Sequence, residues 1–324
     1  MKKFIGVDLG GTNLRVGIVN LDSGTVLAMK SVLTLAREGH DAVMQRMADL
    51  ILDVIISNKV NNTEIGGIGI GVPGVLDLEK GATLFLPNLP DNWLNVPLRE
   101  TISEKTGLPV VLLNDARAVT YGEWKFGAGH GVDTIACFII GTGVGGGLVV
   151  NGRLHLGIGG TAGELGHQTI DYNGPQCGCG NHGCLEAYAS GPAISAMGVK
   201  AVLQGLTTNI GKLEDYDLNK ITPDVIAEAA RQGDVVAKEI YNQVGKYFGI
   251  AIANTIVSVG PRKVVLGGGV AAAGELLFEP IRRTIRERVT IMPVDQVEVV
   301  AASLGRNAGV LGMAVWASQN LIGA

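Results

Sequence analysis

The sequence lacks both a strongly charged surface and a long apolar run. Charged residues make up 17% of its 324 residues, the net charge is −4, and no run of Lys or Arg exceeds two. This composition argues against nucleic acid or a membrane surface as a partner. No stretch of about 18 apolar residues could span a bilayer. Asp8 follows Lys2 and Lys3 too closely for a signal peptide, so we expect a cytoplasmic protein.

Cysteine is scarce as well, and three of the four cysteines are close together. The cluster consists of Cys177, Cys179 and Cys184. An odd cluster in a reducing compartment favours a metal, although free buried cysteines or a CxC redox pair would give the same pattern. Thiolates select zinc, and one more ligand would complete a tetrahedral structural site. His167 and His182 compete for that position, and sequence spacing slightly favours His182, the nearer one.

Glycine, by contrast, is abundant, with 48 residues, and hydrophobic residues make up 47% of the chain. A chain of this length and composition can bury the cores of two α/β domains of ordinary size. Glycines without a collagen period indicate tight turns and close backbone approaches, which phosphate-binding loops require.

Two segments of the chain resemble each other. Residues 4–19 and 135–150 each read as an apolar strand, a glycine-rich turn and a second apolar strand, and Gly10 falls opposite Gly141. Both segments predict β-hairpins whose turns expose backbone N–H groups. They could be two ordinary hairpins, but we favour an internal duplication in which one hairpin opens each of two similar domains.

Strands and helices alternate elsewhere, which predicts parallel pairing and βαβ crossovers. The expected elements are a helix at 43–55, strands at 65–74 and 108–115, a helix at 116–124, and helices that begin at Thr222 and Asp234. Asp41 is the expected N-cap of the first helix. We place one domain at 1–118 and a larger one at 119–302, with a polar insert at about 157–191. A C-terminal helix at about 303–324 should pack back on the first domain.

The first glycine turn has the composition of a magnesium–nucleotide site. Its candidate ligand-binding residues are Asp8, Gly10, Gly11, Thr12 and Asn13. The glycines let amide N–H groups approach phosphate oxygens, Thr12 adds a donor, and Asp8 could hold Mg²⁺ through water. The P-loop motif differs, because it needs Gly-Lys followed by Ser or Thr.

Two further glycine turns are candidates for the same nucleotide. They are formed by Gly141, Thr142 and Gly143, and by Gly267, Gly268 and Gly269. The first of them contains GxGxxG, but a strand rather than a helix follows it, which argues against NAD. Ile139 stands there in place of Asp8, so one metal-bound nucleotide would lie between two domains. The later turn follows an apolar strand and opens a helix, as expected beneath an adenosine.

The chain resembles the ROK family, named for repressors, open reading frames and kinases. The resemblance rests on the three glycine turns, on Glu164-Leu-Gly-His167, and on the segment from Cys177 to Glu186, and it covers essentially the whole chain. It implies the two-domain α/β fold of the actin-like, hexokinase-type ATPases, built from duplicated ribonuclease-H-like domains with a zinc-binding insert. It also implies His167 as the fourth zinc ligand, and a dimer or tetramer.

The same resemblance implies the roles of individual residues in a sugar kinase that uses ATP and Mg²⁺. Asp115 ends an apolar strand and is the expected catalytic base, because phosphoryl transfer to an alcohol needs a carboxylate beside the attacking hydroxyl. On local grounds the Asn-Asp pair could be only a helix N-cap. The expected sugar-binding residues are Gly74, Asn88, Asn114, Asp115, Glu164, His167 and Glu186.

Two other classes of protein share part of these features. A repressor of the family carries a DNA-binding domain before the first hairpin, where only five residues precede Gly6. An ATPase of the chaperone or actin type would share the glycine turns but not the insert. We therefore expect a kinase for a hexose, with glucose favoured over mannose, N-acetylmannosamine, N-acetylglucosamine, allose and fructose. The sequence leaves open whether polyphosphate or ADP could replace ATP as donor.

Overall fold

The fold is built on two five-stranded mixed sheets, seen here in a computed structural model that describes residues 3–86 and 89–321. The first sheet has the order β3-β2-β1-β4-β7. Its strands are β1 (Lys3–Leu9), β2 (Asn13–Asn20), β3 (Thr25–Leu33), β4 (Ile65–Val72) and β7 (Val110–Asn114). The predicted hairpin is β1–β2, and β4 and β7 continue the sheet in parallel.

The second sheet repeats this plan with the order β10-β9-β8-β11-β12. Its strands are β8 (Ile135–Ile140), β9 (Val144–Val150), β10 (Arg153–Leu154), β11 (Lys263–Gly267) and β12 (Glu298–Ala301). The hairpin β8–β9 is antiparallel, and β11 and β12 are added in parallel on the other side of β8. The two sheets therefore agree in strand order and in orientation, which supports a duplication over two unrelated hairpins.

Helices of the first half pack on the first sheet. They are α1 (His40–Ser57) and α2 (Leu98–Thr106), and a small hairpin of β5 (Val75–Asp77) and β6 (Ala82–Phe85) lies between them in the chain. The third helix, α3 (Asp115–Phe126), follows β7 and packs mainly against α9 (Ala308–Leu321) and β9 of the second sheet. The prediction that Asp41 caps α1 is wrong. Gly39, with φ of 89°, occupies the N-cap, and the helix has no side-chain cap. Asp41 lies in the first turn, where a negative charge favours the helix dipole.

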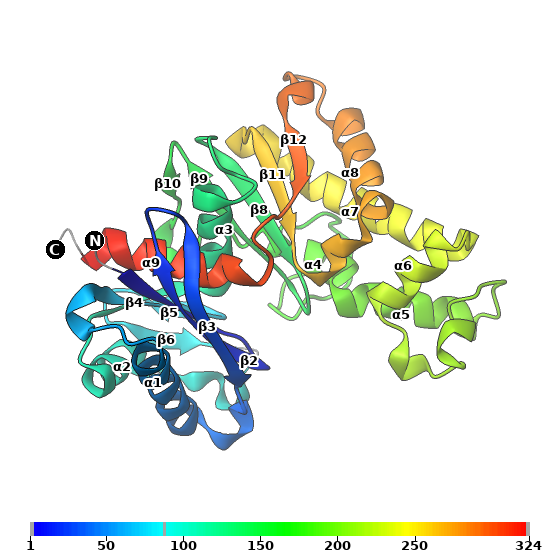
Figure 1. The fold of residues 1–324 in the computed structure, drawn as a ribbon. Coiled ribbons are helices and arrows are strands. Elements are labelled where there is room, and N and C mark those ends of the chain that lie inside the picture. The colour runs from blue at the N-terminus through cyan, green and yellow to red at the C-terminus, as the bar shows by residue number, and fades with distance from the viewer. Residues whose placement is uncertain (1–2, 87–88, 322–324) are drawn as a thin grey trace.

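The last helix, α9 (Ala308–Leu321), lies on the first sheet although it comes from the opposite end of the chain (Figure 1). Glycines allow this close packing. A Cβ at Gly6 would lie 1.9 Å from the carbonyl oxygen of Val310, and one at Gly69 would lie 2.1 Å from that of Met313. The helix backbone therefore rests directly on β1 and β4, and it also packs on α3.

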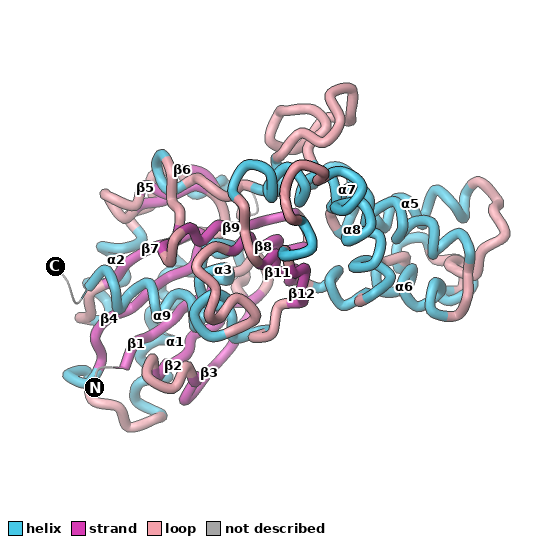
Figure 2. Tube along the Cα trace, turned by 90° about the horizontal axis from the view of Figure 1, so that it is seen from above, coloured by secondary structure: helices cyan, strands magenta, loops and turns pink. Residues whose placement is uncertain are grey.

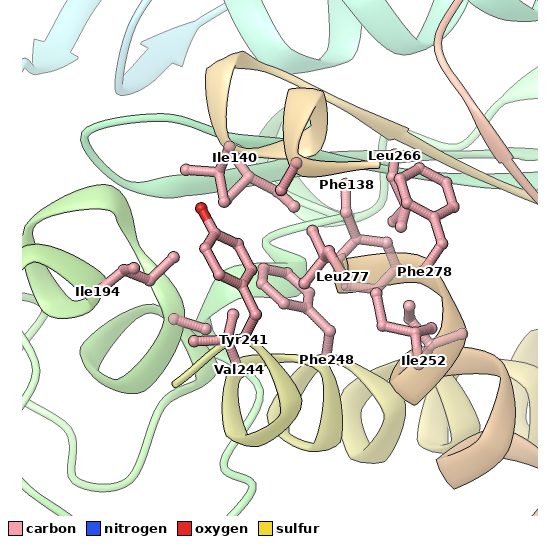
Figure 3. Close-up of a cluster of buried hydrophobic side chains, with 14 of the residues drawn as sticks. Phe138, Ile140, Ile194, Tyr241, Val244, Phe248, Ile252, Leu266, Leu277 and Phe278 are labelled. Carbon is pink, nitrogen blue, oxygen red and sulfur yellow. The ribbon is translucent and has the colours of Figure 1, made fainter. Parts of the chain in front are cut away.

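Helices of the second half form the other end of the molecule, as Figure 2 shows for α5 and α6. They are α4 (Leu185–Ala189), α5 (Gly191–Leu203), α6 (Pro223–Arg231), α7 (Val235–Val259) and α8 (Glu275–Arg288). The predicted helix starts are confirmed, because Thr222 and Asp234 cap α6 and α7 with their side-chain oxygens. Phe138 on β8 meets Phe248 on α7 edge to face, with 6.3 Å between ring centroids, in the core drawn in Figure 3.

One buried carboxylate accepts hydrogen bonds from both segments that connect the two sheets. Glu123 on α3 is fully buried. It accepts hydrogen bonds from the amides of Ala128, Ser303 and Leu304, at distances between 2.8 and 3.1 Å. Ala128 leads into β8, whereas Ser303 and Leu304 lead out of β12 toward α9. Glu123 therefore satisfies backbone donors of both connections, and sequence reasoning did not single it out.

Candidate active site

The first glycine turn carries an ion pair at its base. Asp8, near the end of β1, is paired in register with Arg15 on β2, and its Oδ2 lies 2.9 Å from Arg15 Nη1. Burial raises the pKa of the Asp8 carboxyl, while Arg15 opposes that rise. Sequence reasoning missed Arg15, although a hairpin turn closed by Gly10 and Asn13 places residue 15 opposite residue 8.

Hydrogen bonds with Asn13 and Thr34 fix the backbone of this turn, and the amides at its tip take no part in them. Gly10 N donates to Asn13 O at 2.9 Å. Thr34, which is fully buried, donates its hydroxyl to Gly10 O at 2.6 Å and its amide to Thr12 O at 2.8 Å. Gly11 and Thr12 are exposed, and within the described part of the chain no backbone carbonyl accepts their amides. Two successive N–H groups without a backbone acceptor in that part of the chain are available to a phosphate oxygen.

The second glycine turn is braced in a comparable way. Gly141 N donates to Gly143 O at 2.9 Å, and Gly191 N donates to Gly141 O at 2.8 Å. Thr142 is exposed. Glu186, expected at the sugar, also reaches this turn, because its Oε2 accepts the amide of Val144 at 2.8 Å.

The third glycine turn lies beside the second. Gly267 is paired with Ile139 near the end of β8, and Gly268 has a φ of +87°. A Cβ at Gly268 would lie 2.2 Å from the carbonyl oxygen of Ile140, so only glycine fits there. Gly269 opens a short 3-10 helix that precedes α8. The fold thus brings the second and third predicted turns to one edge of the same sheet.

Asn114 and Asp115 stand where β7 passes into α3. Asn114 caps the helix, as its Oδ1 accepts the amide of Arg117 at 3.2 Å, and its Nδ2 donates to Gly74 O at 3.2 Å. The structure therefore brings Asn114 and Gly74 together, and their place in a sugar pocket stays a prediction. Asn88 lies outside the described residues.

The Asp115 carboxyl has a pKa above that of an ordinary aspartate. It is half-buried at the start of α3, and its Oδ1 accepts the amide of Ala116 at 2.8 Å. Burial is the main cause that raises its pKa to about 6. The Ala116 amide and the positive Arg117 oppose that rise, whereas the charges of Asp8 and Glu164 add to it. Asp115 is therefore close enough to both carboxylates to sense their charge.

Glu164 is held by a residue that sequence reasoning missed. Its Oε1 lies 2.9 Å from Nη2 of Arg117, a buried arginine on α3. The Glu164 side chain is 41% exposed, so part of the carboxylate faces solvent. The only signal for Arg117 in the sequence was its place two residues after Asp115.

Three cysteines and one histidine converge in the insert. They are Cys177, Cys179, Cys184 and His167, whose candidate ligand atoms all lie within 4.8 Å of one another. His182 is exposed and belongs to no such group among residues 3–86 and 89–321. This donor set of three sulfurs and one imidazole nitrogen suits a tetrahedral zinc ion. The cluster adjoins Glu186, because Cys177 Sγ lies 3.8 Å from Glu186 Oε1.

The structure has two mixed sheets of equivalent strand order, and each begins with a hairpin closed by a glycine turn. This arrangement is consistent with the actin-like class of α/β ATPases. In the described ranges no helix combines the length and the apolar composition that a bilayer crossing requires. The chain belongs to the ROK family, whose model matches residues 4–320. The predicted resemblance is confirmed.

The similar proteins include enzymes and regulators. The glucokinase of Thermotoga maritima is 42% identical over 316 residues, which are 96% of each chain. A ROK glucokinase from Streptomyces griseus, solved with glucose and AMPPNP, is 34% identical with a TM-score of 0.84, covering 98% of this chain and 99% of its own. The xylose repressor of Caldicellulosiruptor bescii is 34% identical over 95% of this chain and 76% of its own length. Function must therefore be argued from the site residues.

Proposed function

We propose that this protein transfers the γ-phosphoryl group of ATP to a hydroxyl of glucose, giving glucose 6-phosphate. The observation that carries the proposal is Asp115, a half-buried carboxylate whose pKa is raised to about 6 and which senses the charges of Asp8 and Glu164. Glucokinases at 42% and 34% identity support glucose as acceptor and ATP as donor.

The glycine turns would hold the nucleotide. The free amides of Gly11 and Thr12, with the exposed Thr142, would meet the phosphate oxygens from the two sheets. The turn at Gly267–Gly269, beside the second of these, would lie beneath the adenosine. Asp8 supplies a hard oxygen that suits Mg²⁺, and because Oδ2 is engaged by Arg15, we expect it to act through water. Bound Mg²⁺ would neutralise charge on the transferred phosphate.

The sugar would lie over the start of α3. Glu164 would accept a hydrogen bond from a sugar hydroxyl, and the amide of Asn114, which also donates to Gly74 O, could donate to or accept from another. His167 and Glu186 would face the sugar from the insert. Asp115 would accept the proton of the attacking hydroxyl as that oxygen bonds to the γ-phosphorus and the bond from that phosphorus to the bridging oxygen of ADP breaks. A pKa near 6 keeps the carboxylate largely ionised at neutral pH while leaving it more basic than an ordinary aspartate.

The Cys₃His cluster would hold a structural Zn²⁺, since four donors leave no open coordination position for chemistry. It would fix His167 and the segment that carries Glu186. We also propose that the two domains divide between residues 118 and 119, within α3. The protein would act in glycolysis in the cytoplasm, as a dimer or a tetramer.

A panel of hexoses with ATP and Mg²⁺, monitored for ADP, tests the proposal. We expect glucose to support the highest kcat/KM, with mannose, fructose and the N-acetylhexosamines lower. Polyphosphate in place of ATP tests the donor. ATP hydrolysis that no hexose stimulates would instead favour a chaperone-type or actin-type ATPase.

A further inference from the structure

Arg117 is the one charged residue of α3 that connects the base-bearing helix to the insert loop. The residue is only 1% exposed. Its Nε donates to Ala162 O at 2.8 Å, and its Nη2 donates to Glu164 Oε1 at 2.9 Å. The guanidinium thus bridges a backbone carbonyl and a side-chain carboxylate that lie two residues apart.

The loop that carries these two acceptors has little packing of its own. Gly157, Gly159, Gly160 and Gly163 all have positive φ angles, and Ile158 between them is 94% exposed. Such a segment depends on outside contacts for a single conformation. Arg117 supplies two charge-assisted hydrogen bonds at the end of the loop that leads into Glu164.

A guanidinium buried to this extent is costly unless its donors are satisfied. Glu164 is the only carboxylate with which it forms an ion pair within the described residues. The pair is asymmetric, because the Arg117 side chain is 2% exposed and the Glu164 side chain is 41% exposed. Arg117 engages Glu164 Oε1, and the exposed part of the carboxylate is left to accept a hydrogen bond from a ligand.

We propose that Arg117 is a positioning residue for sugar recognition, which sets the Glu164 carboxylate and the Ala162 carbonyl relative to Asp115 two residues before it. The inference rests on the proposed function, in which Glu164 binds a sugar hydroxyl. Arg117 itself touches neither substrate. An arginine is needed because its planar fork can serve two acceptors at fixed angles, which a lysine ammonium cannot do with the same geometry.

The test compares Arg117→Met and Arg117→Lys with the wild-type enzyme in steady-state kinetics for each substrate. For Arg117→Met we expect KM for glucose to rise by roughly 10- to 100-fold, the effect of losing one or two hydrogen bonds to charged groups. KM for ATP should stay within about twofold. Arg117→Lys should recover part of the loss, because the charge remains while the two-acceptor geometry does not.

Arg282→Met is the matched control. Arg282 on α8 also bridges a carboxylate and a carbonyl, Glu275 at 2.8 Å and Val299 O at 3.1 Å, but neither partner is among the proposed sugar-binding residues. Its replacement should leave both KM values unchanged. An equal rise in KM for glucose in Arg282→Met and Arg117→Met would show that the assay reports only general stability, and would overturn the inference.

A double-mutant cycle separates positioning from a purely structural role. In a Glu164→Gln background, Arg117→Met should raise KM for glucose by only a few-fold, because its partner is already impaired. Additive effects would overturn the inference. Unchanged KM for glucose in Arg117→Lys would do so as well, even if Arg117→Met does not fold. If the wild-type protein phosphorylates no hexose, the proposed function fails instead.

Discussion

Replacement of Asp115 by asparagine should make the protein more stable and almost inactive at once. The folded state holds this carboxyl at a pKa of about 6, compared with the ordinary value of 3.8, mainly because it is buried. The folded state therefore binds the Asp115 proton more tightly than the unfolded state does. The favourable contribution is fully present below pH 4 and is lost as the pH rises through about 6.

The size of this effect follows from the shift. Two pKa units correspond to about 3 kcal/mol, and partial exposure of the side chain reduces that to about 1–3 kcal/mol at pH 7.5. The asparagine side chain of the variant would carry no charge, and its oxygen can still accept the amide of Ala116 as Asp115 does. Asp115→Asn should therefore raise the free energy of unfolding at pH 7.5 by that amount and change it little at pH 4.

Urea unfolding at the two pH values measures the stability difference, and the hexose assay measures turnover. We expect kcat to fall by about 10²- to 10⁴-fold, the loss typical of a missing general base. KM for glucose should change little. In the wild type, kcat/KM should rise with pH through about 6 as Asp115 ionises in the free enzyme. Turnover within a few-fold of the wild type, or lower stability at pH 7.5, would refute the reasoning.

Three other residues give independent predictions. Cys179→Ala should release the bound metal, lower Tm and raise KM for glucose, as metal analysis and calorimetry can check; a metal-free wild type with full activity would contradict this. Thr34→Val should raise KM for ATP several-fold and leave KM for glucose unchanged, because the hydroxyl bond to Gly10 O is lost. Glu123→Gln should lower the free energy of unfolding by about 3 kcal/mol in urea titrations, since amides of both connections share that carboxylate. A change below about 0.5 kcal/mol would deny Glu123 that role.

Local patterns in the sequence predicted most of the architecture. The repeated strand–glycine turn–strand pattern predicted both hairpins, and their equivalent sheets follow from it. The helix starts at Thr222 and Asp234 were predicted because helix-start signals are local, and both side chains cap their helices. The predicted N-cap, Asp41, lies two residues beyond the observed one, since Gly39 provides the start of α1 by conformation rather than by a side-chain bond.

The residues that brace the site could not be predicted in the same way. Arg117 meets Glu164 47 positions further along the chain, and Glu123 meets Ser303 across 180 positions. Thr34 reaches Gly10 only because β3 pairs beside β2. These contacts depend on how the sheets and their connecting segments pack together. The periodicity and spacing of residues in the sequence do not predict that packing. Glu186 was expected at the sugar, but its bond to Val144 also needed the folded insert.

The most direct test of the account couples glucose 6-phosphate formation to ADP release in the wild type and in Asp115→Asn. Wild-type protein with glucose, ATP and Mg²⁺ should form the two products in equal amounts, and the variant should form neither above about one hundredth of that rate. Product formation that persists in the variant, or ADP release without glucose 6-phosphate, would contradict a transfer in which Asp115 activates the sugar hydroxyl.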